Sequence, residues 1–256
     1  MMRERTEQQT NNTQMIEGRN AVHEALRAGR VLDKVFLART EDDGMLGFLG
    51  AKAKEAGAVV VRCDKRKLDQ MSETGAHQGV IAFAAAREYA TIEDVLERAK
   101  ASGRPPLIVI CDEISDPHNL GAIIRSAEAA GAHGVIIPKR HNAGLTAVVE
   151  KASAGALEYM PIVRVPNLVA AMEKLKEQGV WIYGTGLSAS SNLFETDLTG
   201  PTAIVIGSEG DGIGRLVGER CDFMMEIPML GQIQSLNASA AAAVVLFEAV
   251  RQRTTK

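Results

Sequence analysis

The feature that most constrains the fold is a series of short apolar runs with amphipathic stretches between them. Leu107 to Cys111 and Ala203 to Gly207 are continuous apolar runs, as expected of parallel strands buried on both faces. Further strand candidates are Gly134–Ile137, Pro161–Val165, Val180–Tyr183 and Phe223–Ile227. Helix candidates between them are Leu120–Ala130, Leu145–Ala154 and Leu168–Gln178. This alternation predicts an α/β unit with a mainly parallel sheet.

A smaller α/β unit is predicted ahead of it. Its strand candidates are Val31–Leu37, Ala58–Arg62 and Gly79–Ala84, and its helix candidates are Asn20–Ala28, Met45–Ala56 and Lys65–Met71. Residues 1–14 are polar and predict a disordered tail. We therefore expect a tail at 1–14, a first domain at 15–86, a linker at 87–91 and a second domain at 92–256.

The composition excludes several classes of protein and of site. A hydrophobic content of 46% and a charged content of 24% are typical of a soluble globular protein. The net charge of −3 argues against a purely electrostatic nucleic-acid binder, and 4% aromatic residues argue against extensive base stacking. The N-terminus is not a signal peptide, and no apolar run is long enough to span a membrane. Three widely spaced cysteines and the absence of a histidine cluster predict reduced thiols, a cytoplasmic location and no metal site.

Three stretches combine glycines, polar residues and the start of a helix. They are Asp116 to Ala130, Ile204 to Gly214, and Ile227 to Ala243, which runs into an Ala-rich helix ending near Arg251. Ser235 or Asn237 suits the N-cap of that helix because a short side-chain oxygen can accept a free backbone N–H. Free N–H groups and the positive end of the helix dipole can also bind a ligand, although a capped packing helix is the simpler interpretation.

In this order, the three stretches resemble motifs one, two and three of the SpoU/TrmH family of RNA ribose 2'-O-methyltransferases. The resemblance covers nearly the whole chain and is greatest to the type that methylates a guanosine of 23S rRNA. It implies S-adenosylmethionine as cofactor, a homodimer formed through the second domain, and a C-terminal trefoil knot. Residue patterns alone predict an ordinary doubly wound sheet without a knot. The alternatives are a tRNA ribose methyltransferase and a non-catalytic RNA-binding ribosome-assembly factor.

The resemblance assigns the site residues. It implies a catalytic set of Asn119, Arg125, Glu209, Ser235 and Asn237. It implies cofactor binding by Gly207, Ile227 and Leu236, and Thr185 and Gly186 complete that pocket. Taken alone, Arg125 is more simply a solvated or ion-paired arginine. An arginine is a poor base because its pKa exceeds 12, so stabilisation of a developing alkoxide is its easier physical role.

The first domain resembles a ribosomal-protein-like RNA-binding domain, through Gly18–Leu26 and His77–Gly79. From Met15 to Arg87 the chain has 12 Lys and Arg against 10 Asp and Glu, whereas from Glu88 to Lys256 it has 15 against 20. A net positive first part suits contact with a polyanion. The candidate RNA-binding residues are Arg19, Arg30, Lys65, Arg66, His77 and Gln78.

Overall fold

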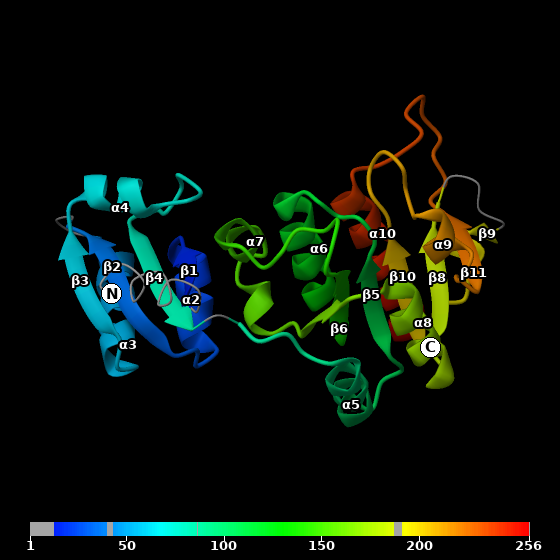
Figure 1. The fold of residues 1–256 in the computed structure, drawn as a ribbon, viewed down its shortest axis with the longest axis horizontal. Coiled ribbons are helices and arrows are strands. Elements are labelled where there is room, and N and C mark those ends of the chain that lie inside the picture. The colour runs from blue at the N-terminus through cyan, green and yellow to red at the C-terminus, as the bar shows by residue number, and fades with distance from the viewer. Residues whose placement is uncertain (1–12, 40–42, 86, 187–190, 256) are drawn as a thin grey trace, which may run out of the picture. The chain divides into compact units, whose positions relative to one another are not determined.

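The structure is a computed structural model that describes residues 13–39, 43–85, 87–186 and 191–255 (Figure 1). It divides into two compact units. The first comprises Met1–Glu88 together with Leu145–Tyr159, and the second comprises Tyr89–Gly144 together with Met160–Lys256. Residues 1–12, where most of the polar tail was predicted, lie outside the described residues. The chain thus enters the first unit a second time, far along the sequence.

The first unit is built on a mixed four-stranded sheet. Its strands and helices are β1 (Thr13–Glu17), α2 (Arg19–Arg27), β2 (Leu32–Ala38), α3 (Gly44–Glu55), β3 (Val59–Cys63), α4 (Lys65–Met71) and β4 (Val80–Ala85). The strand order is β1-β4-β2-β3, with β2 and β3 parallel and the other pairs antiparallel. Strand β1 was not predicted, and it begins within the segment assigned to the tail.

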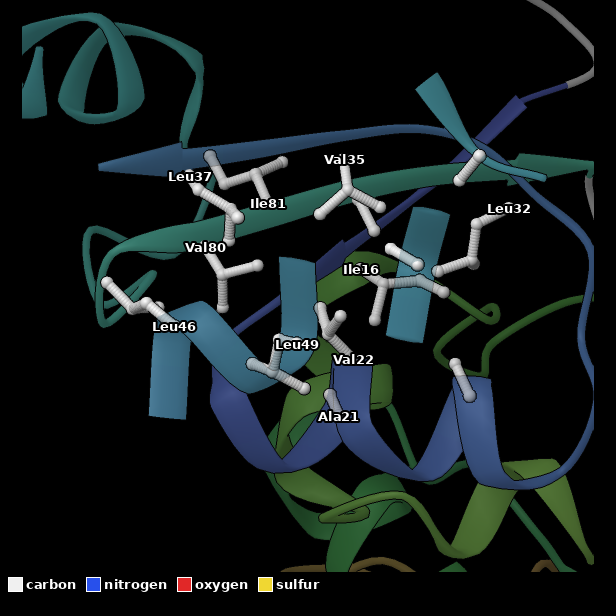
Figure 2. Close-up of a cluster of buried hydrophobic side chains, with 14 of the residues drawn as sticks. Ile16, Ala21, Val22, Leu32, Val35, Leu37, Leu46, Leu49, Val80 and Ile81 are labelled. Carbon is white, nitrogen blue, oxygen red and sulfur yellow. The ribbon is translucent and has the colours of Figure 1, made fainter. Parts of the chain in front are cut away.

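The apolar core of this unit lies between the sheet and helices α2 and α3 (Figure 2). Val35 and Leu37 are fully buried, whereas Lys34 is exposed and Phe36 is half-buried, which is the alternation of a strand covered more fully on one face. Val22 on α2 and Leu49 on α3 meet these strand residues and are also fully buried.

A buried polar cluster attaches the segment Leu145–Tyr159 to this unit. The segment contains α7 (Ala147–Ala152) and the short 3-10 helix η2 (Ala156–Glu158). Arg30 forms ion pairs with Glu150 at 3.5 Å and Glu158 at 3.0 Å, and its side chain is only 12% exposed. Arg87 pairs with Glu158 at 2.7 Å, and Gln14 donates to Glu150 at 2.7 Å. The prediction had placed this helix in the second domain, because no local pattern reveals which partner covers it.

The second unit contains a seven-stranded sheet in which all pairs are parallel. Its elements are α5 (Ile92–Ser102), β5 (Leu107–Cys111), α6 (Pro117–Ala129), β6 (Gly134–Pro138), β7 (Ile162–Val165), α8 (Leu168–Glu177), β8 (Trp181–Thr185), β9 (Ser191–Asn192), η3 (Leu193–Glu195), β10 (Thr202–Ile206), α9 (Arg215–Gly218), β11 (Phe223–Glu226) and α10 (Ala238–Thr254). The strand order is β7-β6-β5-β10-β8-β11-β9. From β5 the chain adds strands toward the β7 edge, and from β8 onward it adds them on the other side of β5, so the direction of strand addition reverses between β5 and β10. Ligands of open α/β sheets bind at the carboxyl ends of strands near such a reversal.

Helices cover both faces of this sheet (Figure 1). Helices α5, α8 and α9 pack on one face, around Ile108, Ile110 and Val205. Helices α6 and α10 pack against one another and against β5 and β10 on the other face. The predicted fold class, two α/β units with a mainly parallel sheet in the second, is confirmed.

Most predicted elements are present within a residue or two of their expected bounds. Helix α10 runs to Thr254 rather than to about Arg251, and the short elements β9, η2, η3 and α9 were not predicted. Such short elements carry too few residues to produce a periodic pattern. Within the described part of the chain, no helix combines the length and apolar character needed to cross a membrane.

Candidate active site

Three side chains from distant parts of the second unit meet in a hydrogen-bonded network. Asn119 Nδ2 donates to Glu209 Oε1 at 2.7 Å, and Asn237 Nδ2 donates to Asn119 Oδ1 at 2.9 Å. Asn237 Nδ2 also donates to Glu209 Oε1. The three residues come from the three sequence motifs, so the fold assembles one member of each motif into a single cluster.

Two helix starts frame this cluster. Asn119 lies in the first turn of α6, which Asp116 caps by accepting from His118 N at 2.9 Å. Asn237 caps α10, because its Oδ1 accepts from the backbone nitrogens of Ser239 and Ala240 at 2.9 and 3.2 Å. Each helix start carries partial positive charge, so the Glu209 carboxylate lies where a negative charge is favoured.

A pocket of about 380 Å³ lies beside Glu209. All five predicted cofactor residues line it, namely Thr185, Gly186, Gly207, Ile227 and Leu236. Its walls also include Glu209 and Ser235, of the predicted catalytic set, and Met224, Met229 and Gln234, which were not predicted. The two methionines come from positions without a local signal, whereas Gln234 lies in a polar loop already noted in the sequence. An apolar pocket of this size with a few polar groups suits a small-molecule cofactor.

The turn that carries Glu209 is held from two sides. Ser208 and Gly212 exchange backbone hydrogen bonds of 2.9 and 3.1 Å, which close the turn. Gly214 N donates to Asp112 Oδ2 at 2.8 Å, at the carboxyl end of β5. Burial raises the pKa of the Asp112 carboxyl, and the hydrogen bond from Gly214 opposes that shift. Asp112 was not predicted, although a carboxylate directly after a buried strand is a recognisable signal.

Gly207 allows this turn to lie against the end of β10. A Cβ at this position would lie 2.2 Å from the carbonyl carbon of Gly212, which is backbone and cannot rotate away. Glycine is therefore required here by close approach of the backbone. The contact fixes where the turn lies relative to the pocket, and hence where Glu209 lies.

Arg125 is separate from both the network and the pocket lining. It is exposed on α6, about 9 Å along the helix from Asn119 at the usual rise per residue. Over the part of the chain that the structure describes, its guanidinium has no recorded hydrogen bond or ion pair. Ser235 is also exposed, on the loop ahead of α10. Both side chains are thus open to a substrate.

Two candidate RNA-binding residues of the first unit are largely buried and engaged by other side chains of the same unit. Arg30 lies in the buried cluster with Glu150 and Glu158, so its charge is already neutralised. His77 is 2% exposed; it accepts from Gly79 N at 3.0 Å and contacts Asp69 Oδ1 at 2.9 Å. Sequence alone does not reveal burial of a polar side chain with long-range partners.

The other four candidates are on the surface of the first unit. Lys65 and Arg66 are exposed on α4, with no hydrogen bond or ion pair recorded among the described residues. Arg19 pairs with Asp43, and its Nε donates to the carbonyl oxygen of Gln78 at 2.9 Å. The backbone of Gln78 has a positive φ of 51°, so this contact holds a strained turn in place. Lys65 and Arg66 are thus the freer cations.

Comparison with known proteins identifies the family. The model of the SpoU rRNA Methylase family matches residues 106–247, and the model named RNA 2'-O ribose methyltransferase substrate binding matches residues 15–90. The first of these spans more than half of the chain and contains all three motifs. In the residues that the structure describes, no group of three His, Cys, Asp or Glu side chains is placed to hold a metal ion.

Individual relatives agree with this assignment. YacO of Bacillus subtilis, named as a TrmH family tRNA/rRNA methyltransferase, is 47% identical over 92% of this chain and 94% of its own. The 23S rRNA (guanosine-2'-O-)-methyltransferase RlmB of Pseudomonas syringae is 41% identical over 94% of this chain and 96% of its own.

The solved structure of a similar protein contains the predicted cofactor. The SpoU methyltransferase AviRb of Streptomyces viridochromogenes, in complex with AdoMet, matches with a TM-score of 0.81 and 27% identity, over 95% of this chain and 92% of that one. The predicted cofactor, S-adenosylmethionine, fits a pocket in which the predicted binding residues come together beside Glu209. The chain belongs to the SpoU rRNA methylase family and is an S-adenosylmethionine-dependent methyltransferase.

Proposed function

We propose that this protein methylates a ribose 2'-hydroxyl of RNA, and that its substrate is a guanosine of large-subunit rRNA. The observation that carries the proposal is the Asn119–Glu209–Asn237 network beside a pocket of cofactor size. The substrate-binding family match at residues 15–90 supports RNA as the substrate, and the relatives named RlmB favour large-subunit rRNA. With rRNA as substrate, we also propose a cytoplasmic location.

Transfer RNA is the second candidate substrate, because YacO carries a name that includes both tRNA and rRNA. The two candidates differ in the RNA that receives the methyl group. Mapping of 2'-O-methyl sites in total RNA from cells with and without the gene separates them. A lost methylation in 23S rRNA supports the proposal, whereas a loss confined to tRNA refutes the rRNA assignment.

The pocket residues have distinct proposed roles toward the cofactor. Backbone groups of Gly207, Ile227 and Leu236 would bind it, with the apolar side chains as walls for the adenine. Bound S-adenosylmethionine supplies an electrophilic methyl group on a positively charged sulfur. Glu209 adds a negative charge to the same wall, and the amides of Asn119 and Asn237 fix the direction of that carboxylate.

We propose that Arg125 and Ser235 act on the RNA. Both side chains are exposed, so a ribose and its phosphate can reach them. A guanidinium fits phosphate oxygens bidentately and stabilises negative charge that develops on an attacking oxygen. The Arg125 guanidinium would thereby favour loss of the 2'-hydroxyl proton, with an RNA phosphate oxygen as the acceptor of that proton.

Substitution of Arg125 tests this role. Arg125→Ala should abolish methyl transfer and leave the affinity for S-adenosylmethionine within several-fold, since Arg125 does not line the pocket. Calorimetry with the cofactor and methyl incorporation into rRNA measure the two effects. Loss of cofactor binding in a folded variant would contradict the assignment.

We further propose that the protein acts as a homodimer and carries the trefoil knot of its family. Val244 and Phe247 are 37% and 49% exposed on α10, although they are large and apolar. They lie three residues apart and hence on one face of the helix, which a second copy would cover. A monomer by light scattering at micromolar concentration, with full activity, would refute the dimer.

A further inference from the structure

A short basic loop follows β6 at the carboxyl edge of the second sheet. Lys139, Arg140 and His141 are consecutive and exposed. Within the described chain, none of these three side chains has a recorded hydrogen bond or ion pair. This loop, which we call the basic loop, was not among the residues assigned to RNA from the sequence.

The basic loop is fixed to the segment that leads into α6. Ala143 N donates to the carbonyl oxygen of Ile114 at 2.8 Å, and Ile114 N donates to Asn142 Oδ1 at 3.0 Å. Ile114 is 2% exposed and lies just before Asp116, the N-cap of α6. The same helix carries Asn119 and Arg125, so the basic loop is held beside the start of the catalytic helix.

The backbone of the basic loop is strained. His141 has a φ of 58°, in the left-handed region that residues with a Cβ rarely adopt. Such conformations persist only where the surroundings hold them, and they concentrate at functional sites. Here the hydrogen bonds of Asn142 and Ala143 hold the turn. In this conformation the side chains of Lys139, Arg140 and His141 are exposed to solvent.

One further cation, Arg164, lies against the basic loop. Arg164 Nη2 donates to the carbonyl oxygen of Lys139 at 3.3 Å, while its guanidinium lies 5.4 Å from the Tyr89 ring centroid. Two exposed carboxylates, Glu113 and Asp116, flank Ile114 in the sequence, but neither forms an ion pair with the basic loop among the described residues. Exposed cations whose side chains are not engaged in ion pairs favour binding of an anion.

We infer that the basic loop binds phosphates of the RNA strand that flank the target ribose. This inference rests on the proposed function. The residues that line the cofactor pocket do not include the basic loop, so its ligand is not the cofactor. An open surface loop with several cations suits the backbone of a polymer, and Arg140 can bind phosphate oxygens bidentately.

The test uses the full-length protein with Lys139→Ala and Arg140→Ala combined. Lys100→Ala combined with Arg220→Ala is the control for charge, because it removes the same charge from exposed positions, with the one difference that Arg220 pairs with Glu173 at 3.4 Å. Those positions precede β5 and β11 and therefore lie at the amino edge of the same sheet. Calorimetry with S-adenosylmethionine and thermal unfolding verify that each variant is folded and keeps its cofactor site.

Binding to a 23S rRNA transcript is then measured against salt concentration, together with KM and kcat for methyl transfer. We expect the loop variant to bind RNA at least about tenfold more weakly, because hydrogen bonds to charged groups are lost. We expect its salt slope to fall by about 1.4 if two single-strand phosphate contacts disappear. KM for RNA should rise, while the affinity for S-adenosylmethionine stays unchanged.

Three outcomes separate the inference from the function on which it rests. Equal RNA affinity and salt slope in the loop variant and the unaltered protein would overturn the inference. An equal loss in the control variant would also overturn it, because general charge rather than the basic loop would then be responsible. If the unaltered protein bound S-adenosylmethionine but methylated no RNA, the proposed function would fail instead.

Discussion

Replacement of Gly207 by alanine tests whether the turn after β10 positions the site. The added Cβ would lie 2.2 Å from the carbonyl carbon of Gly212 and 2.4 Å from the nitrogen of Ile213. Ordinary contacts begin near 3.4 Å, so the turn would have to withdraw by about 1 Å. That movement displaces Glu209 from Asn119 and Asn237 and changes the shape of the pocket.

The size of the effect follows from that displacement. A misplacement of 1 Å at an active site can cost on the order of 100-fold in rate. This factor corresponds to about 2.7 kcal/mol of transition-state stabilisation. Overpacking in a well-packed region also costs roughly 1–3 kcal/mol of unfolding free energy. We therefore expect kcat/KM to fall about 100-fold or more, with weaker binding of S-adenosylmethionine.

Gly200→Ala is the control, since it lies just before the same strand and a Cβ there would have no heavy atom within 4 Å. Both variants are compared by calorimetry with S-adenosylmethionine, methyl transfer to rRNA and urea unfolding. If Gly207→Ala matched Gly200→Ala in cofactor affinity and rate, the close approach of the turn would not control the site.

Three further predictions concern the network, the buried ion cluster and a buried histidine. Asn237→Ala should lower the unfolding free energy by about 0.5–2 kcal/mol through loss of the α10 cap, and should reduce methyl transfer; unchanged activity would remove Asn237 from the site. Arg30→Met should cost about 3–5 kcal/mol in urea unfolding, because Glu150 and Glu158 stay buried without it; a loss below about 1 kcal/mol would contradict the ion-pair role. Burial, and then nearby arginines, lower the pKa of His133 from 6.5 to about 4, so the unfolded chain binds the proton first as pH falls. Stability should therefore decline from pH 6.5 to about pH 4, and His133→Gln should show a smaller decline in thermal unfolding over that window.

The buried ion cluster also changes what a truncation would do. The sequence predicts that deletion of Met15–Arg87 leaves a folded, cofactor-binding domain with weaker rRNA methylation and a smaller salt slope. In the structure, that deletion removes Arg30 and Arg87 from Glu150 and Glu158. We expect the segment Leu145–Tyr159 to lose its packing in such a protein, so point variants at Lys65 and Arg66 are the cleaner test of RNA binding by the first unit. The corresponding prediction for the tail is that removal of residues 1–14 leaves activity near normal, although Gln14 belongs to β1 and contacts Glu150.

The sequence by itself determined the α/β class, most elements and the family. Runs such as Leu107–Cys111 specify buried strands because apolar residues without alternation need cover on both faces. The three motifs identified Asn119, Glu209 and Asn237, and the five predicted cofactor residues all line one pocket. The assignments of these residues could be made from the sequence because each depends on residue type and spacing within a short stretch, although their meeting in one place depends on the fold.

Tertiary structure alone decided which side chains meet. Arg30 and His77 look like exposed polar side chains in the sequence, yet Arg30 is largely buried in an ion pair with Glu158, and His77 is buried and contacts Asp69. The placement of Leu145–Tyr159 in the first unit and the basic loop beside Ile114 depend on contacts between segments far apart in the chain. The free energy of burying a charge depends on its partners, and partners brought together by the fold leave no periodic signal in the sequence.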